Sequence, residues 1–268
     1  MTASGSELLE IARTIAREAG ALALLRRSQG VAVAATKSSS VDVVTEADRE
    51  TERLIRALLA EQRPDDGILG EEGGGSPGTS GLTWVVDPID GTTNYLYGIP
   101  QWAVSIAVVE GEPDPLTWNA RAAAVFNPAS GELFSAASGE GAWLGEEPIH
   151  IPDPPPLERA LIGTGFAYAS EMRGIQGEIA AKLLPQVRDI RRIGTASLDL
   201  CFVACGRFDA YYERTLSPWD HAAGALVARE AGAAVFGRNR GAPDREMILA
   251  AHPDLADRLE EVLLGLGF

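Results

Sequence analysis

The apolar residues near the N-terminus recur with the spacing of an amphipathic helix. Between residues 7 and 27 the inward positions are Leu8, Ile11, Ile15, Ala19, Leu22 and Leu25. A second run of this kind begins after Thr45 and Asp48, which have the spacing of a capping box with aspartate in the place of glutamate, and ends before Pro64. The pattern predicts two helices, with Asp48 in the first turn of the second, where its charge favours the helix dipole.

Further along the chain, short apolar runs separated by turn-forming residues are typical of strands. Residues 68–72 form one such run, and the Gly- and Ser-rich residues 73–81 after it predict a flexible loop. Residues 127–131 have the composition of a turn that joins two strands into a hairpin. The strands predicted in this part lie at residues 84–86, 103–109, 122–126 and 133–136.

A stiff, proline-rich stretch at residues 151–156 predicts a linker. We therefore expect two halves, residues 1–151 and residues 157–268. Beyond the linker, strands and helices alternate, which predicts mixed sheets layered with helices, an α/β (α+β) fold. The predicted strands are 160–163, 189–193, 209–213, 233–236 and 247–250, and the predicted helices are 174–184, 195–204, 219–231 and a last one from Pro253.

Composition narrows the class of protein. The chain has 268 residues, of which 46% are hydrophobic, enough for a sizeable core. A net charge of −15 argues against a nucleic-acid partner, because phosphate backbones require basic patches, and it fits a protein that holds divalent cations. No apolar run approaches the roughly 18 residues of a membrane span. The N-terminus has no signal-peptide pattern, so we expect a cytoplasmic protein without a membrane partner.

Two acidic motifs carry the chemistry. The first, Asp-Pro-Ile-Asp-Gly-Thr-Thr-Asn at residues 87–94, follows an apolar strand, and its proline predicts a tight loop on which Asp87 and Asp90 converge. Converging carboxylates repel each other unless they are protonated or bridged by a hard cation, and oxygen ligands suit Mg²⁺ or Mn²⁺. Gly91 and Thr92 offer backbone N–H groups at a helix start, which can seat a phosphate. The motif therefore predicts metal-assisted phosphoryl chemistry.

With the second motif, Trp-Asp-His-Ala-Ala-Gly at residues 219–224, and Gly-Glu-Glu at residues 70–72, the chain resembles the inositol monophosphatase family, in its bacterial branch. The resemblance runs from about Glu7 to the C-terminus. It implies the layered α/β/α/β/α sandwich of the inositol monophosphatase and fructose-1,6-bisphosphatase type. It also implies Mg²⁺-dependent hydrolysis of small phosphate monoesters, with inhibition by lithium.

The resemblance also implies roles for single residues. Glu71, Asp87 and the Ile89 carbonyl would hold a first metal, and Asp87, Asp90 and Asp220 a second. We expect two or three Mg²⁺ ions, which Mn²⁺ can replace. Glu71, Thr92 and Asp48 are the candidate catalytic residues, because a threonine hydroxyl held by a helix-start carboxylate can orient or pass a proton.

Substrate contacts follow from the same resemblance. Gly194, Thr195 and Ala196 would line the substrate side, together with Asp90, Gly91, Thr92 and Asp220. Glu213 resembles a carboxylate that accepts hydrogen bonds from ring hydroxyls, as suits a phosphorylated polyol. Lys37 resembles a family lysine on a mobile loop that closes near the metals. Relatives of this kind are commonly dimers, so we expect a homodimer.

Several functions stay open at this point. We expect hydrolysis of myo-inositol monophosphate, and the alternatives that share the metal motifs are phosphatases of histidinol phosphate, fructose 1,6-bisphosphate or phosphoadenosine phosphate. An alternative of a different class is a partner of the transcription machinery, as some bacterial relatives are. The sequence does not fix the preferred ester, the resting number of metals or the affinity for lithium.

Overall fold

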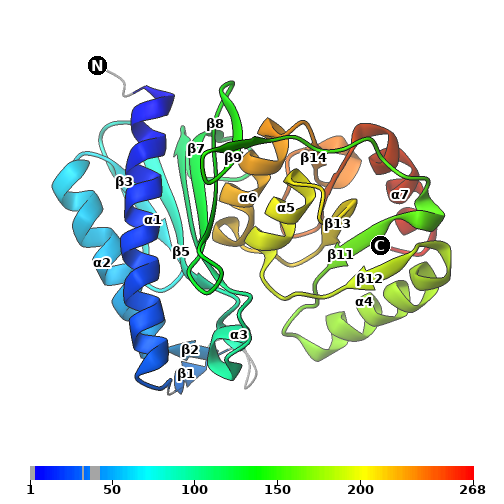
Figure 1. The fold of residues 1–268 in the computed structure, drawn as a ribbon, viewed down its shortest axis with the longest axis horizontal. Helices are drawn as coiled ribbons and strands as arrows, with labels where there is room; N and C mark the ends of the chain where they lie inside the picture. Colours follow the sequence, from blue (N-terminus) through cyan, green and yellow to red (C-terminus); the bar gives the residue numbers. More distant parts are fainter. Residues whose placement is uncertain (1–3, 32, 37–42) are drawn as a thin grey trace.

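The computed structural model describes residues 4–31, 33–36 and 43–268. In Figure 1 its layers follow one another from left to right. Helices α1 (Gly5–Ser28) and α2 (Glu46–Gln62) cover one face of an eight-stranded sheet. Helices α5 (Ala196–Ala204) and α6 (Pro218–Glu230) lie between this sheet and a five-stranded one. Helices α4 (Ser170–Leu183) and α7 (Pro253–Gly265) cover the far face of the second sheet, so the predicted layered α/β/α/β/α fold is confirmed.

The first sheet has the strand order β10-β9-β8-β7-β6-β5-β3-β4. Neighbouring strands are antiparallel except β3 and β5, which run parallel. The predicted hairpin joins β7 to β8. The strands are β3 (Gly67–Gly70), β4 (Gly74–Ser76), β5 (Leu82–Asp90), β6 (Ala103–Glu110), β7 (Asn119–Asn127), β8 (Glu132–Ala137), β9 (Gly141–Leu144) and β10 (Glu147–Ile149).

The second sheet has the order β12-β11-β13-β15-β14, with β11 parallel to both of its neighbours. Its strands are β11 (Leu161–Thr164), β12 (Asp189–Arg191), β13 (Ala210–Glu213), β14 (Ala234–Phe236) and β15 (Ile248–Ala251). The smaller elements are β1 (Val33–Thr36), β2 (Val43–Thr45), α3 (Thr92–Tyr97), and the single turns η1 (Leu157–Arg159), η2 (Leu184–Gln186) and η3 (Arg238–Arg240).

Two local predictions need correction. The segment predicted as a flexible loop at residues 73–81 contains β4, which pairs with β3 because glycine backbones hydrogen-bond at a sheet edge without side-chain packing. The tight loop expected directly after Val86 is also wrong, because β5 continues to Asp90. The register of β5 against β6 shifts between Asp87 and Asp90, so the strand passes Pro88 with an irregularity instead of ending there.

Side chains of β5 point alternately to the two faces of the first sheet, so this strand contributes to both main hydrophobic cores. Trp84 and Val86 face α1 and α2, whereas Val85 faces α5 and α6, because successive side chains of a strand point to opposite faces. The Trp84 indole N–H donates to Asp66 Oδ2 at 2.9 Å, so the buried ring keeps a partner for its one polar atom. The strand that carries Asp87 and Asp90 is thus packed on both faces.

The boundary between the halves stays a prediction. Residues 150–156 form neither helix nor strand, in agreement with a linker. Within the described ranges, no helix is long and apolar enough to cross a membrane.

Packing of α1 on the first sheet predicts the effect of a small substitution. A Cβ on Gly20 would lie 2.5 Å from a ring carbon of Phe126, so Gly20→Ala should destabilise the protein by about 1–3 kcal/mol through overpacking. Gly174 in α4 is exposed and would meet nothing within 4 Å, so Gly174→Ala should instead stabilise it by about 0.5–1 kcal/mol. Urea unfolding measures both, and equal free energies of unfolding for the two variants would contradict the close contact.

Candidate active site

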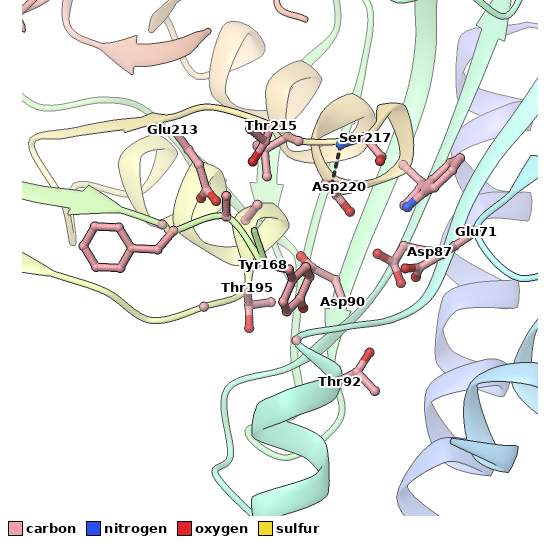
Figure 2. Close-up of a pocket in the computed structure, with 18 of the residues that line it drawn as sticks. Glu71, Asp87, Asp90, Thr92, Tyr168, Thr195, Glu213, Thr215, Ser217 and Asp220 are labelled. Carbon is pink, nitrogen blue, oxygen red and sulfur yellow. Dashed lines mark hydrogen bonds between the residues drawn. The ribbon is translucent and has the colours of Figure 1, made fainter. Parts of the chain in front are cut away.

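A pocket of ≈ 480 Å³ lies where the first sheet, the second sheet and the helices between them meet. Figure 2 places Glu71 and Asp87 on one side of this pocket and Glu213 on the other, with Asp90 and Asp220 between them. The predicted site residues that line it are Glu71, Asp87, Ile89, Asp90, Gly91, Thr92, Gly194, Thr195, Ala196, Glu213 and Asp220.

Backbone pairing brings Glu71 beside Asp87. The Glu71 N–H donates to the Val86 carbonyl at 3.2 Å, which extends the parallel pairing of β3 with β5. Asp87 Oδ1 accepts the Ile89 N–H at 3.0 Å, a bond that spans the irregular part of β5. The carboxylates that follow β3 and end β5 therefore line the same pocket.

Hydrogen bonds from the middle helices fix Asp90 and Asp220. Asp90 Oδ2 accepts the N–H of Ser197, in the first turn of α5, at 2.8 Å. Asp220 Oδ2 accepts the Ser217 N–H at 2.6 Å, drawn as the dashed line in Figure 2, and closes a capping box at the start of α6. Asp90 thus connects β5 to a helix that lies more than a hundred residues later in the chain.

Burial and crowding of these carboxylates raise their pKa values. Burial, followed by repulsion from Glu71, Asp90 and Asp220, raises the pKa of Asp87 well above its usual range. Burial raises the pKa of Asp90 to about 6, although its bond from Ser197 acts in the opposite direction. Asp220 keeps part of its surface open to the pocket, yet the surrounding protein raises its pKa well above normal too, with Glu71 and Asp90 adding repulsion. Burial and repulsion between neighbouring carboxylates therefore disfavour the charged forms of all three aspartates.

Thr92 and Asp48 form a buried pair beside the carboxylates. The Thr92 hydroxyl lies 3.2 Å from Asp48 Oδ1 and 3.1 Å from the Ile89 carbonyl oxygen. Asp48 Oδ2 accepts the Thr45 N–H at 2.8 Å and the Thr45 hydroxyl at 2.5 Å, so the predicted capping box exists. Asp48 does not line the pocket itself and reaches it only through Thr92. Burial raises its pKa to about 6.

The pocket offers ligand atoms of the type that a hard cation binds. It consists of carboxylates and a backbone carbonyl, which are oxygen ligands typical for Mg²⁺. As the side chains of the described ranges stand, however, no group of three His, Cys, Asp or Glu is close enough to hold one ion. Glu71, Asp87, Asp90 and Asp220 nevertheless line the same pocket, so they are the residues that would hold a cation there.

Glu213 closes the opposite side of the pocket at the end of β13. Its Oε2 accepts the hydroxyl of Tyr211 at 2.5 Å, and burial raises its pKa to about 7. A Cβ on Gly165 would lie 1.9 Å from Glu213 Oε2, so only glycine leaves room for this carboxylate.

Sequence reasoning missed the roles of Tyr211 and Arg245. Tyr211 and Gly165 position Glu213, and Arg245 lines the pocket together with Arg192. Asp199 in α5 is buried, and neither of its carboxylate oxygens has a hydrogen-bond partner in the described structure. No sequence motif marks these positions, because their roles arise from contacts between distant segments. Lys37 lies outside the described residues.

The chain is similar to known proteins along nearly its whole length. The model of the inositol monophosphatase family matches residues 4–264. An inositol-1-monophosphatase of Mycobacterium leprae is 44% identical over 93% of this chain and 90% of its own length. A Nus factor SuhB of Xylella fastidiosa is 39% identical over 94% of this chain and 93% of its own. The crystal structure of the extragenic suppressor protein suhB of Bartonella henselae superimposes with a TM-score of 0.87 at 35% identity, covering 95% of this chain and 97% of that one.

The raised pKa values predict how stability depends on pH in the presence of a chelator. The folded values, about 6 for Asp48 and Asp90 and about 7 for Glu213, exceed the ordinary values of 3.8 and 4.5. The folded state therefore binds more protons than the unfolded state in this window, and stability falls as pH rises through it. Thermal unfolding in EDTA should show a Tm that declines from about pH 4.5 to pH 7.5.

A variant identifies the groups responsible. Asp87→Asn keeps the shape and the acceptor for the Ile89 N–H but removes one charge from the cluster. Its Tm in EDTA should decline less over the same pH range and exceed the wild-type value at pH 7.5. A wild-type Tm that rises over this range, or a variant with the same slope, would contradict the assigned repulsion.

Proposed function

Because this chain belongs to the inositol monophosphatase family, we propose that it hydrolyses myo-inositol monophosphate to inositol and phosphate with the help of Mg²⁺. The observation that carries this proposal is the convergence of Glu71, Asp87, Asp90 and Asp220 on one pocket. Burial and the crowding of like charges raise the pKa values of the three aspartates, and a bound cation would offset both. A phosphatase is the activity for which such a cluster is suited.

We assign the metal ligands within this pocket. Glu71, Asp87 and the Ile89 carbonyl would hold one ion, and Asp87, Asp90 and Asp220 a second, with Asp87 shared. Bound Mg²⁺ supplies positive charge for the phosphate oxygens and lowers the pKa of water. The number of ions, and the replacement of Mg²⁺ by Mn²⁺, stay predictions.

Three residues orient the attacking water and accept its proton. Thr92 Oγ1 contacts Asp48 Oδ1 and the Ile89 carbonyl oxygen, so it is held in place to orient a water molecule. Glu71 faces the same space and accepts the proton that the water loses, and Asp48 polarises the Thr92 hydroxyl. The new bond joins this water oxygen to phosphorus. The bond from phosphorus to the alcohol oxygen breaks, and that oxygen regains a proton from solvent.

The remaining wall of the pocket binds the alcohol. Gly91 and Thr92 offer N–H groups to the phosphate, and Gly194, Thr195 and Ala196 face the polyol, with Asp90 and Asp220 close to the scissile bond. Glu213 accepts hydrogen bonds from ring hydroxyls. Inhibition by lithium, a homodimeric state, cytoplasmic location and the role of Lys37 stay predictions.

The alternatives are separable by experiment. Phosphate release from inositol 1-phosphate, histidinol phosphate, fructose 1,6-bisphosphate and phosphoadenosine phosphate, with and without Mg²⁺, ranks the candidate esters. Some relatives are named Nus factors, so a role with the transcription machinery remains the alternative of another class. Retention of RNA polymerase on the immobilised protein at physiological salt, with no release of phosphate from any ester, would favour that role.

The shared-ligand assignment predicts the result of one substitution. Asp87→Asn should lower kcat by several orders of magnitude at saturating Mg²⁺, because a ligand common to both ions loses its charge while the fold persists. Asp65→Asn makes the same chemical change on an exposed side chain remote from the pocket and serves as the control. Steady-state kinetics decides the matter, and retention of more than about half of the wild-type activity would show that Asp87 is not shared.

We expect Glu213 to determine which ester is preferred and to take no part in the cleavage of the bond to phosphorus. Glu213→Gln keeps an acceptor for the Tyr211 hydroxyl but loses a charge-assisted bond to the substrate, worth about 1.5–3 kcal/mol. We expect kcat/KM on inositol 1-phosphate to fall about ten- to a hundred-fold, with little change on an aryl phosphate that lacks ring hydroxyls. Equal losses on both would place Glu213 among the catalytic or metal-binding groups, and no loss on either would remove it from the site.

A further inference from the structure

One segment of the pocket wall carries aromatic side chains. Residues 165–169, which connect β11 to α4, all line the pocket, and Phe166 and Tyr168 are two of them. Phe166 is half-buried, whereas Tyr168 is 44% exposed. Trp219 also lines the pocket, but it packs against the core between the two sheets. Among the described residues, Tyr168 is the one exposed large hydrophobic side chain that lines this pocket, and accessible apolar surface in a pocket indicates a contact with a ligand.

Hydrogen bonds hold the backbone of this segment in place. The Ala167 N–H, between the two aromatic residues, donates at 2.8 Å to Oε1 of Gln176, a buried residue of α4. The Ala169 carbonyl, directly after them, accepts the Arg173 N–H at 2.9 Å. The backbone that carries the aromatic rings is therefore fixed before a ligand binds, which reduces the entropy that binding would cost.

The same segment packs against Glu213. A Cβ on Gly165 would lie 1.9 Å from Glu213 Oε2, so this carboxylate lies directly against the backbone that leads into Phe166. In the view of Figure 2 the ring of Tyr168 lies between Glu213 and Asp87. A hydrogen-bond acceptor and an aromatic surface therefore belong to the same part of the pocket wall. A cyclic polyol can use both, because its hydroxyls project from the edge of the ring while the C–H groups of its faces form no strong hydrogen bonds.

We propose that the ring of Tyr168 packs on the face of a ring in the alcohol part of the substrate, so that esters of cyclic alcohols are preferred over esters of open-chain alcohols. This inference rests on the proposed phosphatase activity and names the class of alcohol. Removal of the apolar ring face from water favours the contact. An open chain presents no flat face to the aromatic ring and loses more conformational freedom when it is bound.

Three esters separate the ring from its hydroxyls. Inositol 1-phosphate has a ring that carries hydroxyls, phenyl phosphate has a ring without them, and glycerol 2-phosphate has hydroxyls without a ring. The alcohol part of all three is uncharged. Each variant is compared with the wild type on the same ester, so that differences in leaving-group reactivity cancel. Phenyl phosphate distinguishes Tyr168 from Glu213, because Glu213→Gln should leave the hydrolysis of this ester nearly unchanged.

Substitutions of Tyr168 test the contact. Tyr168→Ala should lower kcat/KM about ten-fold on both ring esters and less than about two-fold on glycerol 2-phosphate. The loss should appear mainly as a higher KM, because the packing is the same in the ground state and the transition state. Tyr168→Phe keeps the ring and should recover most of the wild-type value. Tyr97→Ala makes the same change as Tyr168→Ala on a side chain that is 76% exposed outside the pocket, and it should match the wild type on all three esters.

The outcomes are distinct. Equal losses on all three esters in Tyr168→Ala would place Tyr168 at the phosphate, and unchanged values on both ring esters would remove it from the alcohol. Either result would overturn this inference and leave the proposed phosphatase intact. A loss in Tyr168→Phe as large as in Tyr168→Ala would assign the effect to the hydroxyl and overturn the inference too, as would a similar loss in Tyr97→Ala. No hydrolysis of any ester by the wild type would contradict the phosphatase proposal and this inference with it. Melting temperatures of all variants exclude unfolding as the cause.

Discussion

Burial of like charges at one place is the constraint on which this structure depends. Asp87 is 2% exposed and Asp90 8% exposed, and burial together with repulsion between neighbouring carboxylates raises the pKa values of both and of Asp220. Each of these carboxylates accepts one backbone N–H, from Ile89, Ser197 and Ser217. Such bonds favour the charged form and offset part of the cost of burial. Because the donors lie on β5, at the start of α5 and at the start of α6, the site exists only when the layers are assembled.

Contacts between segments far apart in the chain are therefore part of the site. Asn94 Nδ2, in α3, donates to the Gln101 carbonyl at 2.7 Å and to the Ile193 carbonyl at 2.9 Å. The Thr195 hydroxyl donates to the same Gln101 carbonyl at 2.7 Å. Gly91, with a φ of 90°, has no room for a Cβ, which would lie 2.4 Å from Thr195 Oγ1. The turn at Gly91 and the turn at Gly194 are thus held together by bonds between segments about a hundred residues apart.

The sequence predicts the regular elements well, because their burial follows the 3.6- and 2-residue periods of helix and strand. It also predicts which carboxylates meet, since Asp87, Asp90 and Asp220 are part of motifs with a recognisable context. It fails where tertiary contacts decide the outcome. The pairing of β4 depends on the exposed edge of β3, and the irregularity of β5 depends on the register with β6. The support of Glu213 by Tyr211 likewise follows from geometry that no local pattern encodes.

Carboxylates outnumber arginines around the pocket, and this excess of negative charge opposes the entry of an anionic substrate. A protein of net charge −15 repels anions at long range, and the carboxylates of the pocket would repel a phosphate at short range. Cations bound at the carboxylates would remove the second obstacle but would not change the charge on the Glu213 side of the pocket. There the fixed positive charges are Arg192 and Arg245, and Arg245 is held by a bond from Thr215, whose φ of 71° is strained for a β-branched residue. The chain tolerates this strain in the short turn between Glu213 and Asp220, so the turn sets Glu213, Arg245 and the start of α6 relative to one another.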